Sequence, residues 1–387
     1  MNSFNATFTP NVMYGRPVHE ALCDLSIAHN VNSILIVTDS TIVELGLLDQ
    51  SVAKIKSHGI NVNVFSDVEA DPSYETVLRA ADLGRHVQSG LVIGFGGGSS
   101  LDVAKLVSVL IHPDCNQALD KMFGVDQITS PRIDLILVPT TAGTGSEATP
   151  ISIVTTGKTT KAGIVSPTLL PDHAVLDPKL TTGLPANVTA ATGVDAMVHA
   201  IEAYTSKIKK NPISDVLACK ALILLSNNIR TVVFDGKNIE ARGAMLLGSM
   251  LAGQAFANAP VGGVHALAYP LGGHFHIPHG LSNALMLPHV MRFNLSHAVK
   301  HYAELANIVC PKNKLGDDEE SNANALIEYL VGLINEVALP DQLRQCGIAE
   351  EDLPLLASEA MLQQRLLVNN PRELNEADAL RLYKQAF

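Results

Sequence analysis

The 387-residue chain has no tryptophan, and aromatic residues make up only 4% of it. Small and branched aliphatic side chains must therefore fill its interior. Charged residues are also few, at 17%, and the formal net charge is -11. The densest basic run, residues 207–210, is expected to be a solvated turn. Nucleic acids and anionic membranes attract basic surfaces, so we expect neither as a partner.

The cysteines are odd in number and scattered, and no two of them form a CxxC pair. We expect reduced thiols, and none has metal-ligand spacing. Residues 1–10 lack the basic and apolar regions of a secretory signal. The longest apolar stretch, near residues 244–259, is shorter than a membrane span. These features predict a cytoplasmic protein. The cysteines are Cys23, Cys115, Cys219, Cys310 and Cys346.

The length predicts two domains. The first half alternates β-branched runs with helical patterns, which is typical of parallel βαβ units. After about residue 186 the strand signal fades and helical periodicity continues to the end. We therefore expect an α/β domain over 1–185 and an all-α domain over 186–387. Strands are predicted at 32–40 and 61–67, and helices at 50–58, 75–88 and 101–111. Residues 89–100 are predicted to be a strand that enters a glycine turn, and 134–147 a strand followed by a loop.

Two loops in the first half carry backbone and hydroxyl donors. The run GFGGGSSLD (94–102) joins a strand to a helix, where N–H groups and the helix dipole suit a pyrophosphate. Ser99 takes the last glycine position of GxGxxG, so the match is imperfect, and a tight turn without a ligand is the alternative. The run TTAGTGSE (140–147) follows another strand. Loops at the carboxyl ends of parallel strands face one crevice, so together they predict a nucleotide site.

Asp39 ends the first predicted strand. Its carboxylate could accept hydrogen bonds from the ribose hydroxyls and would repel a 2′-phosphate, which favours NAD over NADP. A helix N-cap aspartate is the alternative interpretation.

The second half carries candidate metal ligands. Asp195 and His199 are four residues apart on a predicted helix and share a face, although a surface hydrogen bond explains such a pair as well. Residues 264–280 contain four histidines and no charged side chain. His265 is expected on a short helix that breaks at Pro270, with the others in an irregular segment. A carboxylate with several imidazoles suits Fe(II), Zn, Mn or Co.

Four segments together resemble the iron-containing alcohol dehydrogenases. They are GGGSSLDVAK, PTTAGTGSE, GVDAMVHAIEAY and GGVHALAYPLGGHFHIPHGLSNALMLPHVMRFN. The match covers almost the whole chain and is closest to the short members acting on small primary alcohols and diols. The resemblance implies an N-terminal Rossmann-like NAD-binding α/β domain, a C-terminal helical metal-binding and catalytic domain, and a dehydroquinate synthase-like architecture. It also implies a homodimer or higher homo-oligomer.

The resemblance implies the site residues as well. Fe(2+), with Zn(2+) as the alternative, would be held by Asp195, His199, His265 and His279. The NAD path would be lined by Asp39, Gly97, Gly98, Ser99, Asp102, Thr140, Thr141, Thr144, Ser146 and Lys161. Two positions depart from the family pattern. Tyr269 stands where many members have a proton-handling histidine, which leaves Tyr269 and His274 as candidates for that role. Asp71 stands where many have asparagine, which is expected to weaken NAD binding.

We expect a metal-dependent, NAD(H)-linked dehydrogenase that interconverts small primary alcohols or diols and aldehydes. The metal would polarise the substrate oxygen while hydride passes to or from nicotinamide. Alternatives are a glycerol or polyol-phosphate dehydrogenase or a dehydroquinate synthase-like cyclase of the same fold, and a metallohydrolase. A structural metal fits less well, since such sites favour cysteine.

Overall fold

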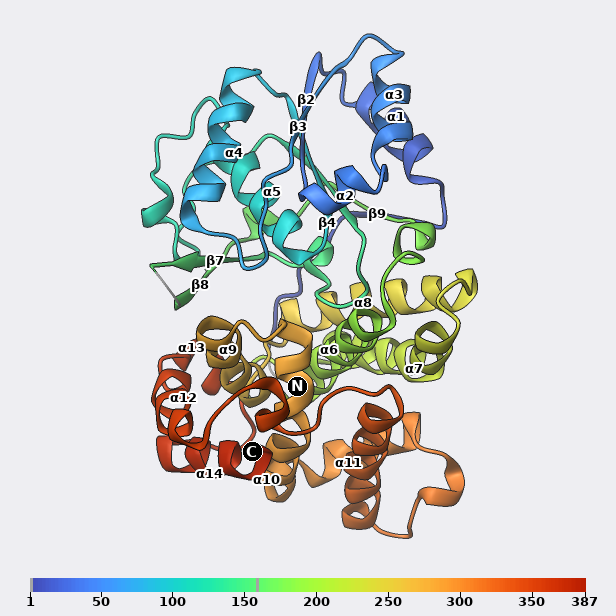
Figure 1. Cartoon of the computed structure of the whole chain (residues 1–387), viewed down its shortest axis with the longest axis vertical. Coiled ribbons are helices and arrows are strands. Elements are labelled where there is room, and N and C mark those ends of the chain that lie inside the picture. The colour runs from blue at the N-terminus through green and yellow to red at the C-terminus, as the bar shows by residue number, and fades with distance from the viewer. Residues whose placement is uncertain (1–2, 158–159) are drawn as a thin grey trace. The chain divides into compact units, whose positions relative to one another are not determined.

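The computed structural model describes residues 3–157 and 160–387 (Figure 1). One unit consists of Thr7–Thr182, and the other combines residues 3–6 with Gly183–Phe387. The chain therefore divides at 182/183, where the sequence predicted 185/186, and its first described residues belong with the second unit. The first unit is an α/β structure and the second is built from helices, so the predicted fold class is confirmed.

The first unit is built on a six-stranded sheet in which every pair is parallel, in the order β1-β9-β6-β4-β2-β3. A second, three-stranded sheet has the order β5-β8-β7. The strands of the large sheet are β1 (Asn11–Tyr14), β2 (Ser33–Val37), β3 (Asn61–Phe65), β4 (Leu91–Gly96), β6 (Asp134–Pro139) and β9 (His173–Leu176). Those of the small sheet are β5 (Gly124–Val125), β7 (Ile151–Thr156) and β8 (Thr160–Val165).

Helices cover both faces of the large sheet (Figure 1). All five residues of β2 are buried. Ile34 and Ile36 join the core cluster of α1 and α3, and Leu35 and Val37 that of α4 and α5. This two-sided burial explains the continuous apolar runs of the central strands. The helices are α1 (Val18–Ala28), α2 (Ser40–Glu44), α3 (Asp49–Lys56), α4 (Tyr74–His86) and α5 (Gly98–Leu110).

A buried lysine ties the loop after β6 to α5. Lys105 is fully buried, and its Nζ donates to Ser146 Oγ at 2.7 Å and to the carbonyl of Ile151 at 2.7 Å. It also lies 3.3 Å from Asp102 Oδ1. Burial lowers the pKa of Lys105, and the Asp102 charge opposes that shift. Because a buried cation is costly unless it is surrounded by partners, this network holds the loop in one conformation.

The second unit is composed of α6–α14. The bounds are α6 (Ala186–Thr205), α7 (Pro212–Phe234), α8 (Ile239–Asn258), α9 (Gly263–Phe275), α10 (His279–Val309), α11 (Glu319–Glu336), α12 (Leu353–Ala360), α13 (Gln364–Leu367) and α14 (Glu376–Ala386). By length and composition α7 is apolar enough to cross a membrane, with a mean hydropathy of 1.4 and 44% of its apolar window buried. It packs along α6 and α8, as a core helix of a folded unit does.

The predicted break at Pro270 is wrong, because α9 continues through that residue to Phe275. Pro270 has no N–H to donate to the carbonyl four residues earlier, which costs about 3 kcal/mol in a helix interior. Almost every residue of α9 up to Gly273 is buried, however, and this apolar packing outweighs the lost hydrogen bond. His274 therefore lies on the helix itself, and His279 begins the next one.

Close contact between α6 and α10 depends on Gly280. A Cβ atom at this position would lie 2.4 Å from the carbonyl oxygen of Ala191. The two backbones therefore meet where α10 begins, beside the segment of α6 that carries Asp195 and His199.

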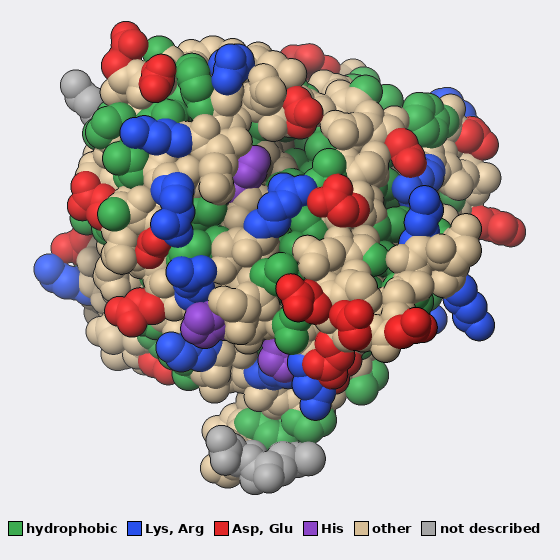
Figure 2. Space-filling view, turned by 90° about the horizontal axis from the view of Figure 1, so that it is seen from below, with side chains coloured by type: hydrophobic (Ala, Val, Ile, Leu, Met, Phe, Trp, Pro, Cys, Tyr) green, Lys and Arg blue, Asp and Glu red, His purple; other side chains and the backbone are tan. Residues whose placement is uncertain are grey.

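Acidic and basic side chains are interspersed on the face shown in Figure 2. That face has no broad patch of basic side chains of the kind that nucleic-acid binding uses.

Substituting Gly280→Ala should lower the free energy of unfolding by about 1–3 kcal/mol, because the new methyl group overlaps rigid backbone. Gly332→Ala is the matched control, since a Cβ at that position on α11 meets no atom within 4 Å. It should raise stability by about 0.5–1 kcal/mol through helix propensity. Urea denaturation of both variants measures the two effects. Equal changes in the free energy of unfolding for the two variants would contradict the close contact between α6 and α10 at Gly280.

Glu147 should make stability depend on pH. Its side chain is buried, Oε1 has no hydrogen-bond partner among the described residues, and burial raises its pKa from 4.5 to about 7. Its own backbone N–H and the Lys105 charge oppose that shift. The folded state then holds a proton that the unfolded state releases above about pH 4.5. The Glu147 contribution is therefore complete below that pH and is lost as the pH rises through 7.

Between pH 5 and 8 the wild-type protein should lose up to about 3 kcal/mol relative to Glu147→Gln, whose amide does not ionise. Denaturation curves across this range test the difference. Glu320→Gln, at an exposed position of α11, is the control, and its stability should change with pH as that of the wild type does. Parallel curves for Glu147→Gln would show that this carboxyl group does not titrate in the folded protein.

Candidate functional site

Helix α6 supplies two of the predicted metal ligands. Asp195 and His199 are both buried, and their i, i+4 spacing places them on one face of the helix. The alternative of a surface hydrogen bond does not apply to them. His199 stacks on Phe256 of α8, with ring centroids 4.5 Å apart, and on His265, at 4.7 Å.

The other two ligands come from neighbouring helices. His265 lies in the first turn of α9 and is buried, and His279 is the first residue of α10, after Pro278. The His265 and His279 ring centroids are 5.4 Å apart. One potential ligand atom from each of the four predicted residues lies within 4.8 Å of the other three.

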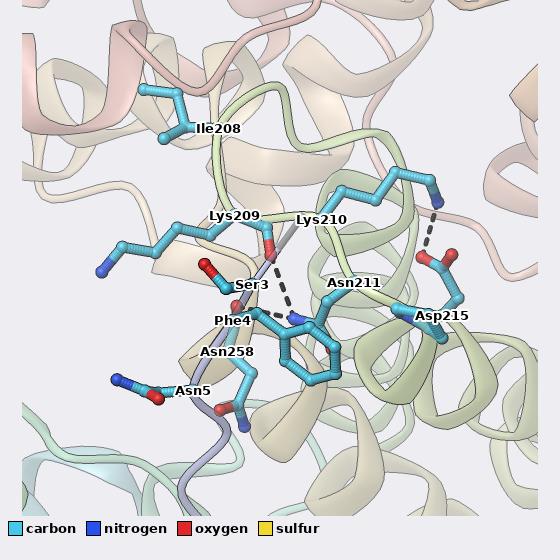
Figure 3. Close-up of a pocket in the computed structure, with 10 residues that line it drawn as sticks. Ser3, Phe4, Asn5, Ile208, Lys209, Lys210, Asn211, Asp215 and Asn258 are labelled. Carbon is cyan, nitrogen blue, oxygen red and sulfur yellow. Dashed lines mark hydrogen bonds and ion pairs between the residues drawn. The ribbon is translucent and has the colours of Figure 1, made fainter. Parts of the chain in front are cut away.

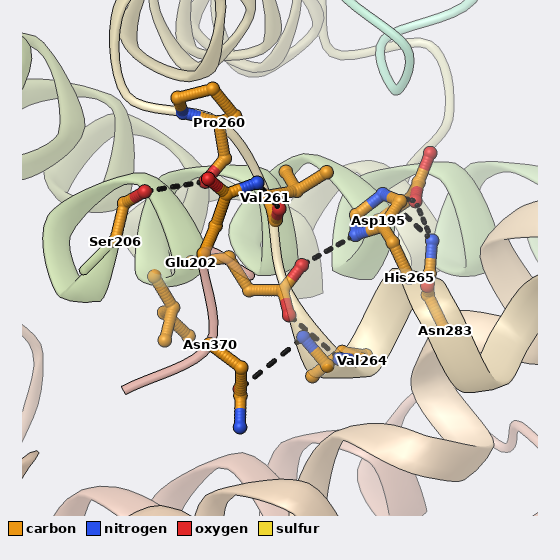
Figure 4. Close-up of polar contacts among 12 residues, drawn as sticks. Asp195, Glu202, Ser206, Pro260, Val261, Val264, His265, Asn283 and Asn370 are labelled. Atoms are coloured by element: carbon orange, nitrogen blue, oxygen red, sulfur yellow. Dashed lines mark hydrogen bonds and ion pairs between the residues drawn. The ribbon is translucent and has the colours of Figure 1, made fainter. Parts of the chain in front are cut away.

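Asn283 shows where these atoms point (Figure 4). It lies one turn after His279 on α10, and its Nδ2 donates to Asp195 Oδ1 at 2.6 Å. The same nitrogen is 3.2 Å from His265 Nε2 and 3.3 Å from His279 Nε2. The carboxylate oxygen and both imidazole nitrogens are therefore directed at one small region.

The electrostatics of this cluster suit a cation. Burial alone would raise the pKa of Asp195, but His199, His279, His265 and the Asn283 amide together hold it below its usual value. The Asn283 Oδ1 atom is buried without a hydrogen-bond partner among the described residues. A carboxylate oxygen and imidazole nitrogens, with no thiolate, fit a divalent ion of the Fe(II) or Zn type.

The two candidates for proton transfer have different surroundings. The Tyr269 ring lies 5.9 Å from the His279 ring, and so beside the cluster. His274 lies near the end of α9, with Nε2 3.6 Å from Glu359 Oε2. Tyr269 is thus the candidate that the structure places next to a predicted ligand.

In the first unit, the predicted cofactor residues other than Lys161 follow three neighbouring parallel strands, β2, β4 and β6, whereas Lys161 lies on β8 of the small sheet. A Cβ at Gly98 would lie 2.8 Å from Thr144 Cγ2, and one at Gly97 would be 3.8 Å from Thr141 Cγ2. The glycine turn and the hydroxyl-rich loop therefore lie against each other, as their position at one sheet edge predicts. Thr140 is buried, and its N–H donates to the carbonyl of Gly96. Ser99 lies in the first turn of α5.

Some of these residues hold the loops together through their own side chains. Asp39 caps α2, because Oδ1 accepts from the N–H of Ile42. Asp102 Oδ1 accepts from Ser146 Oγ at 2.6 Å, and its Oδ2 accepts from the N–H of Ile153 at 2.9 Å. Both carboxylate oxygens of Asp102 therefore already have protein partners.

Lys161 has a charged partner that the sequence did not suggest. Its Nζ lies 2.6 Å from Asp71 Oδ1, and only 7% of the lysine side chain is exposed. Asp71 has a φ of 53°, in the left-handed region. The Asp71 carboxylate is therefore neutralised by the lysine predicted to approach the cofactor.

Sequence reasoning missed Glu202 and Asn283, which both touch the cluster. Glu202 is three residues after His199 on the same face of α6, and its Oε2 is 2.6 Å from His265 Nδ1. This spacing was the signal that could have found it. Asn283 was detectable as the polar residue one turn after His279 in an apolar segment.

A cavity of about 610 Å³ lies elsewhere in the second unit (Figure 3). It is lined by residues 3–5 and 208–212, with Asp215 and Asn258, and includes none of the predicted site residues. Lys210 pairs with Asp215 at 2.5 Å, and the Asn211 side chain caps α7. The polar groups that these residues bring to the cavity thus serve the local fold.

Comparisons with known proteins agree over both units. Residues 9–178 match the family model for iron-containing alcohol dehydrogenase, and residues 189–387 match that for the C-terminal part of the Fe-containing alcohol dehydrogenase family. The chain is 42% identical to Long-chain-alcohol dehydrogenase 1 of Geobacillus thermodenitrificans (strain NG80-2), over 92% of this chain and 89% of the relative.

Two solved structures are similar along their length. The structure of a 1,3-propanediol oxidoreductase has a TM-score of 0.95 and 34% identity, covering 100% of both chains. A sulfoacetaldehyde reductase from Bifidobacterium kashiwanohense, in complex with NAD+, has a TM-score of 0.88 and 26% identity, covering 100% of this chain and 99% of that one. These matches do not favour the hydrolase or polyol dehydrogenase alternatives. The chain belongs to the iron-containing alcohol dehydrogenase family and is an oxidoreductase.

Proposed function

We propose that this chain interconverts small primary alcohols or diols and the corresponding aldehydes, using NAD and a divalent metal ion, Fe(2+) or Zn(2+). The observation that carries the proposal is the convergence of one carboxylate and three imidazoles within 4.8 Å. The relatives are named for long-chain alcohols, 1,3-propanediol and sulfoacetaldehyde. A terminal carbon that carries a hydroxyl or aldehyde oxygen is common to these compounds.

We assign the metal to Asp195, His199, His265 and His279. When bound, the metal supplies positive charge at the substrate oxygen, and NAD accepts or donates the hydride. The residues supply position: α6, α9 and α10 aim the ligand atoms inward, and Asn283 orients the Asp195 carboxylate. Tyr269, beside His279, is assigned to donate a hydrogen bond toward the substrate oxygen.

We assign NAD to the loops that follow β2, β4 and β6. Gly97 and Gly98 leave their backbone open to a pyrophosphate, and Thr140, Thr141 and Thr144 add donors. Asp102 and Ser146 support these loops through each other. Asp39 can cap α2 with Oδ1 and still present Oδ2 to a ribose hydroxyl, since a carboxylate has several acceptor sites.

The same proposal includes a cytoplasmic homodimer or higher homo-oligomer. The location is supported by the cysteines, all five of which are free thiols.

Replacing His265 with Ala should remove bound metal and turnover together, because it deletes a buried ligand. Metal content after reconstitution with Fe(II) or Zn(II), and absorbance at 340 nm with a panel of primary alcohols, measure the two losses. His297→Ala, at an exposed position of α10, is the control and should retain both. A metal-free His265→Ala enzyme with full activity would refute the assignment.

Asp71→Asn should tighten NAD binding about two- to fivefold, because it releases Lys161 from its ion pair while Asn tolerates the left-handed backbone. The modest size follows from the partial exposure of the Asp71 carboxylate. Calorimetric titration with NAD measures the change. Asp82→Asn, which breaks the exposed pair with Arg85 on α4, should leave the affinity as it is. Unchanged or weaker binding by Asp71→Asn would contradict the placement of Lys161 in the cofactor path.

A further inference from the structure

Glu202 is a buried carboxylate directly behind the metal candidates, and nothing in the family resemblance assigned it a role. It follows Asp195 and His199 on α6 at i+7 and i+3, so all three side chains share one face of that helix. Only 6% of Glu202 is exposed. The cavity that it helps to line measures about 10 Å³, which leaves no room for bulk water around it.

Both oxygens of this carboxylate bind the first turn of α9 (Figure 4). Oε1 accepts from the N–H of Val264 at 2.7 Å, which is one of the backbone donors that a helix N-terminus leaves unpaired. Oε2 lies 2.6 Å from Nδ1 of His265. The carboxylate therefore holds both the backbone and the side chain of this part of α9.

The contact determines which nitrogen of His265 carries hydrogen. An ionised carboxylate only accepts hydrogen bonds, so Nδ1 must be the donor. In neutral imidazole the lone pair is then on Nε2. Nε2 is the atom that lies 4.0 Å from Asp195 Oδ1 and 3.2 Å from Asn283 Nδ2, on the side where the ligand atoms meet.

We propose that Glu202 is a positioning residue of the metal site: it fixes the tautomer and ring orientation of His265 and adds a second negative charge behind the ligands. This rests on the proposed ligand set. A carboxylate bonded to a ligand histidine raises the basicity of the imidazole, and its loss typically weakens metal binding about 10- to 100-fold. Together, Asp195 and Glu202 match the charge of a divalent ion.

A merely structural role is the competing explanation, since Glu202 also anchors the start of α9. The two roles separate in a Glu202→Gln variant. Its amide oxygen can still accept from Val264, but its NH₂ group faces Nδ1 of His265 and cannot accept a hydrogen. Nδ1 must then act as acceptor, which moves the hydrogen to Nε2 and blocks the ligand position.

The experiment measures Co(II) affinity by competition with a chelator, the Co(II) visible absorption spectrum, and the melting temperature in excess EDTA. For Glu202→Gln we expect about 10- to 100-fold weaker Co(II) binding and an altered spectrum. Glu304→Gln is the matched control. The Glu304 carboxylate accepts a hydrogen bond from Tyr204 in the same unit, and among the described residues it contacts none of the proposed ligands. Its affinity and spectrum should equal those of the wild type.

The proposal is overturned if Glu202→Gln keeps the Co(II) affinity and spectrum of the wild type. A lower melting temperature in EDTA alone would then show only a structural role for Glu202. His265→Ala distinguishes the failures. If it loses Co(II) while Glu202→Gln does not, only the Glu202 inference fails. If it too binds Co(II) normally, the proposed ligand set fails.

A second measurement reads the His265 tautomer in the wild-type protein and uses a variant only to assign the signal. Histidine-selective 15N NMR of the wild-type Zn(II)-loaded protein should show His265 with hydrogen on Nδ1 and the metal on Nε2. The His265 signal is assigned by its absence from His265→Ala. Hydrogen on Nε2, or no hydrogen on Nδ1, would overturn the proposal.

Discussion

The packing of the helical unit depends on bringing Asp195 and three imidazoles to one point inside an apolar interior. A buried carboxylate and imidazole lone pairs are costly unless they are paired. Their convergence requires three helices to approach closely, and Gly280 permits this because no side chain separates α10 from the Ala191 carbonyl. The site and the helix packing are therefore one constraint: a residue that spreads these helices also separates the ligands.

A second set of polar groups holds the four proposed ligands in place. Glu202 accepts from both Val264 and His265, and the carboxamide of Asn370 accepts from the N–H of Gly263. Asn370 also exchanges two hydrogen bonds of 2.8 Å with Asn294 of α10. The start of α9 is thus held from α6, from α10 and from the C-terminal segment. Glu202 restricts His265 directly, and Asn370 fixes the backbone two residues before it, as a site of defined geometry requires.

The sequence predicted the parts of this arrangement that depend on spacing, and it failed where tertiary packing decides. Asp195 and His199 follow from helical periodicity, and the two loops follow from their place after parallel strands. The break at Pro270 was wrong because burial of α9 outweighs one lost hydrogen bond. The short strands β1 and β9 carry too few residues for an alternating pattern, and a contact such as that of Lys161 with Asp71 joins residues far apart along the chain.

The polar groups around the nucleotide loops are of two kinds. Some hold the loops in place, and others remain as donors for a ligand. Lys105, Asp102 and Ser146 bond to one another and to the backbone at Ile151 and Ile153. They therefore rigidify the loop, although Asp102 and Ser146 were predicted to line the cofactor path. The donors left for a ligand are backbone groups beside Gly97 and Gly98 and the nearby hydroxyls. A motif match alone does not separate these two groups of residues, because both lie in the same motif segments. The hydrogen-bond partners separate them, and they support our proposal that a pyrophosphate is recognised through the backbone, where a side-chain substitution changes the donors least.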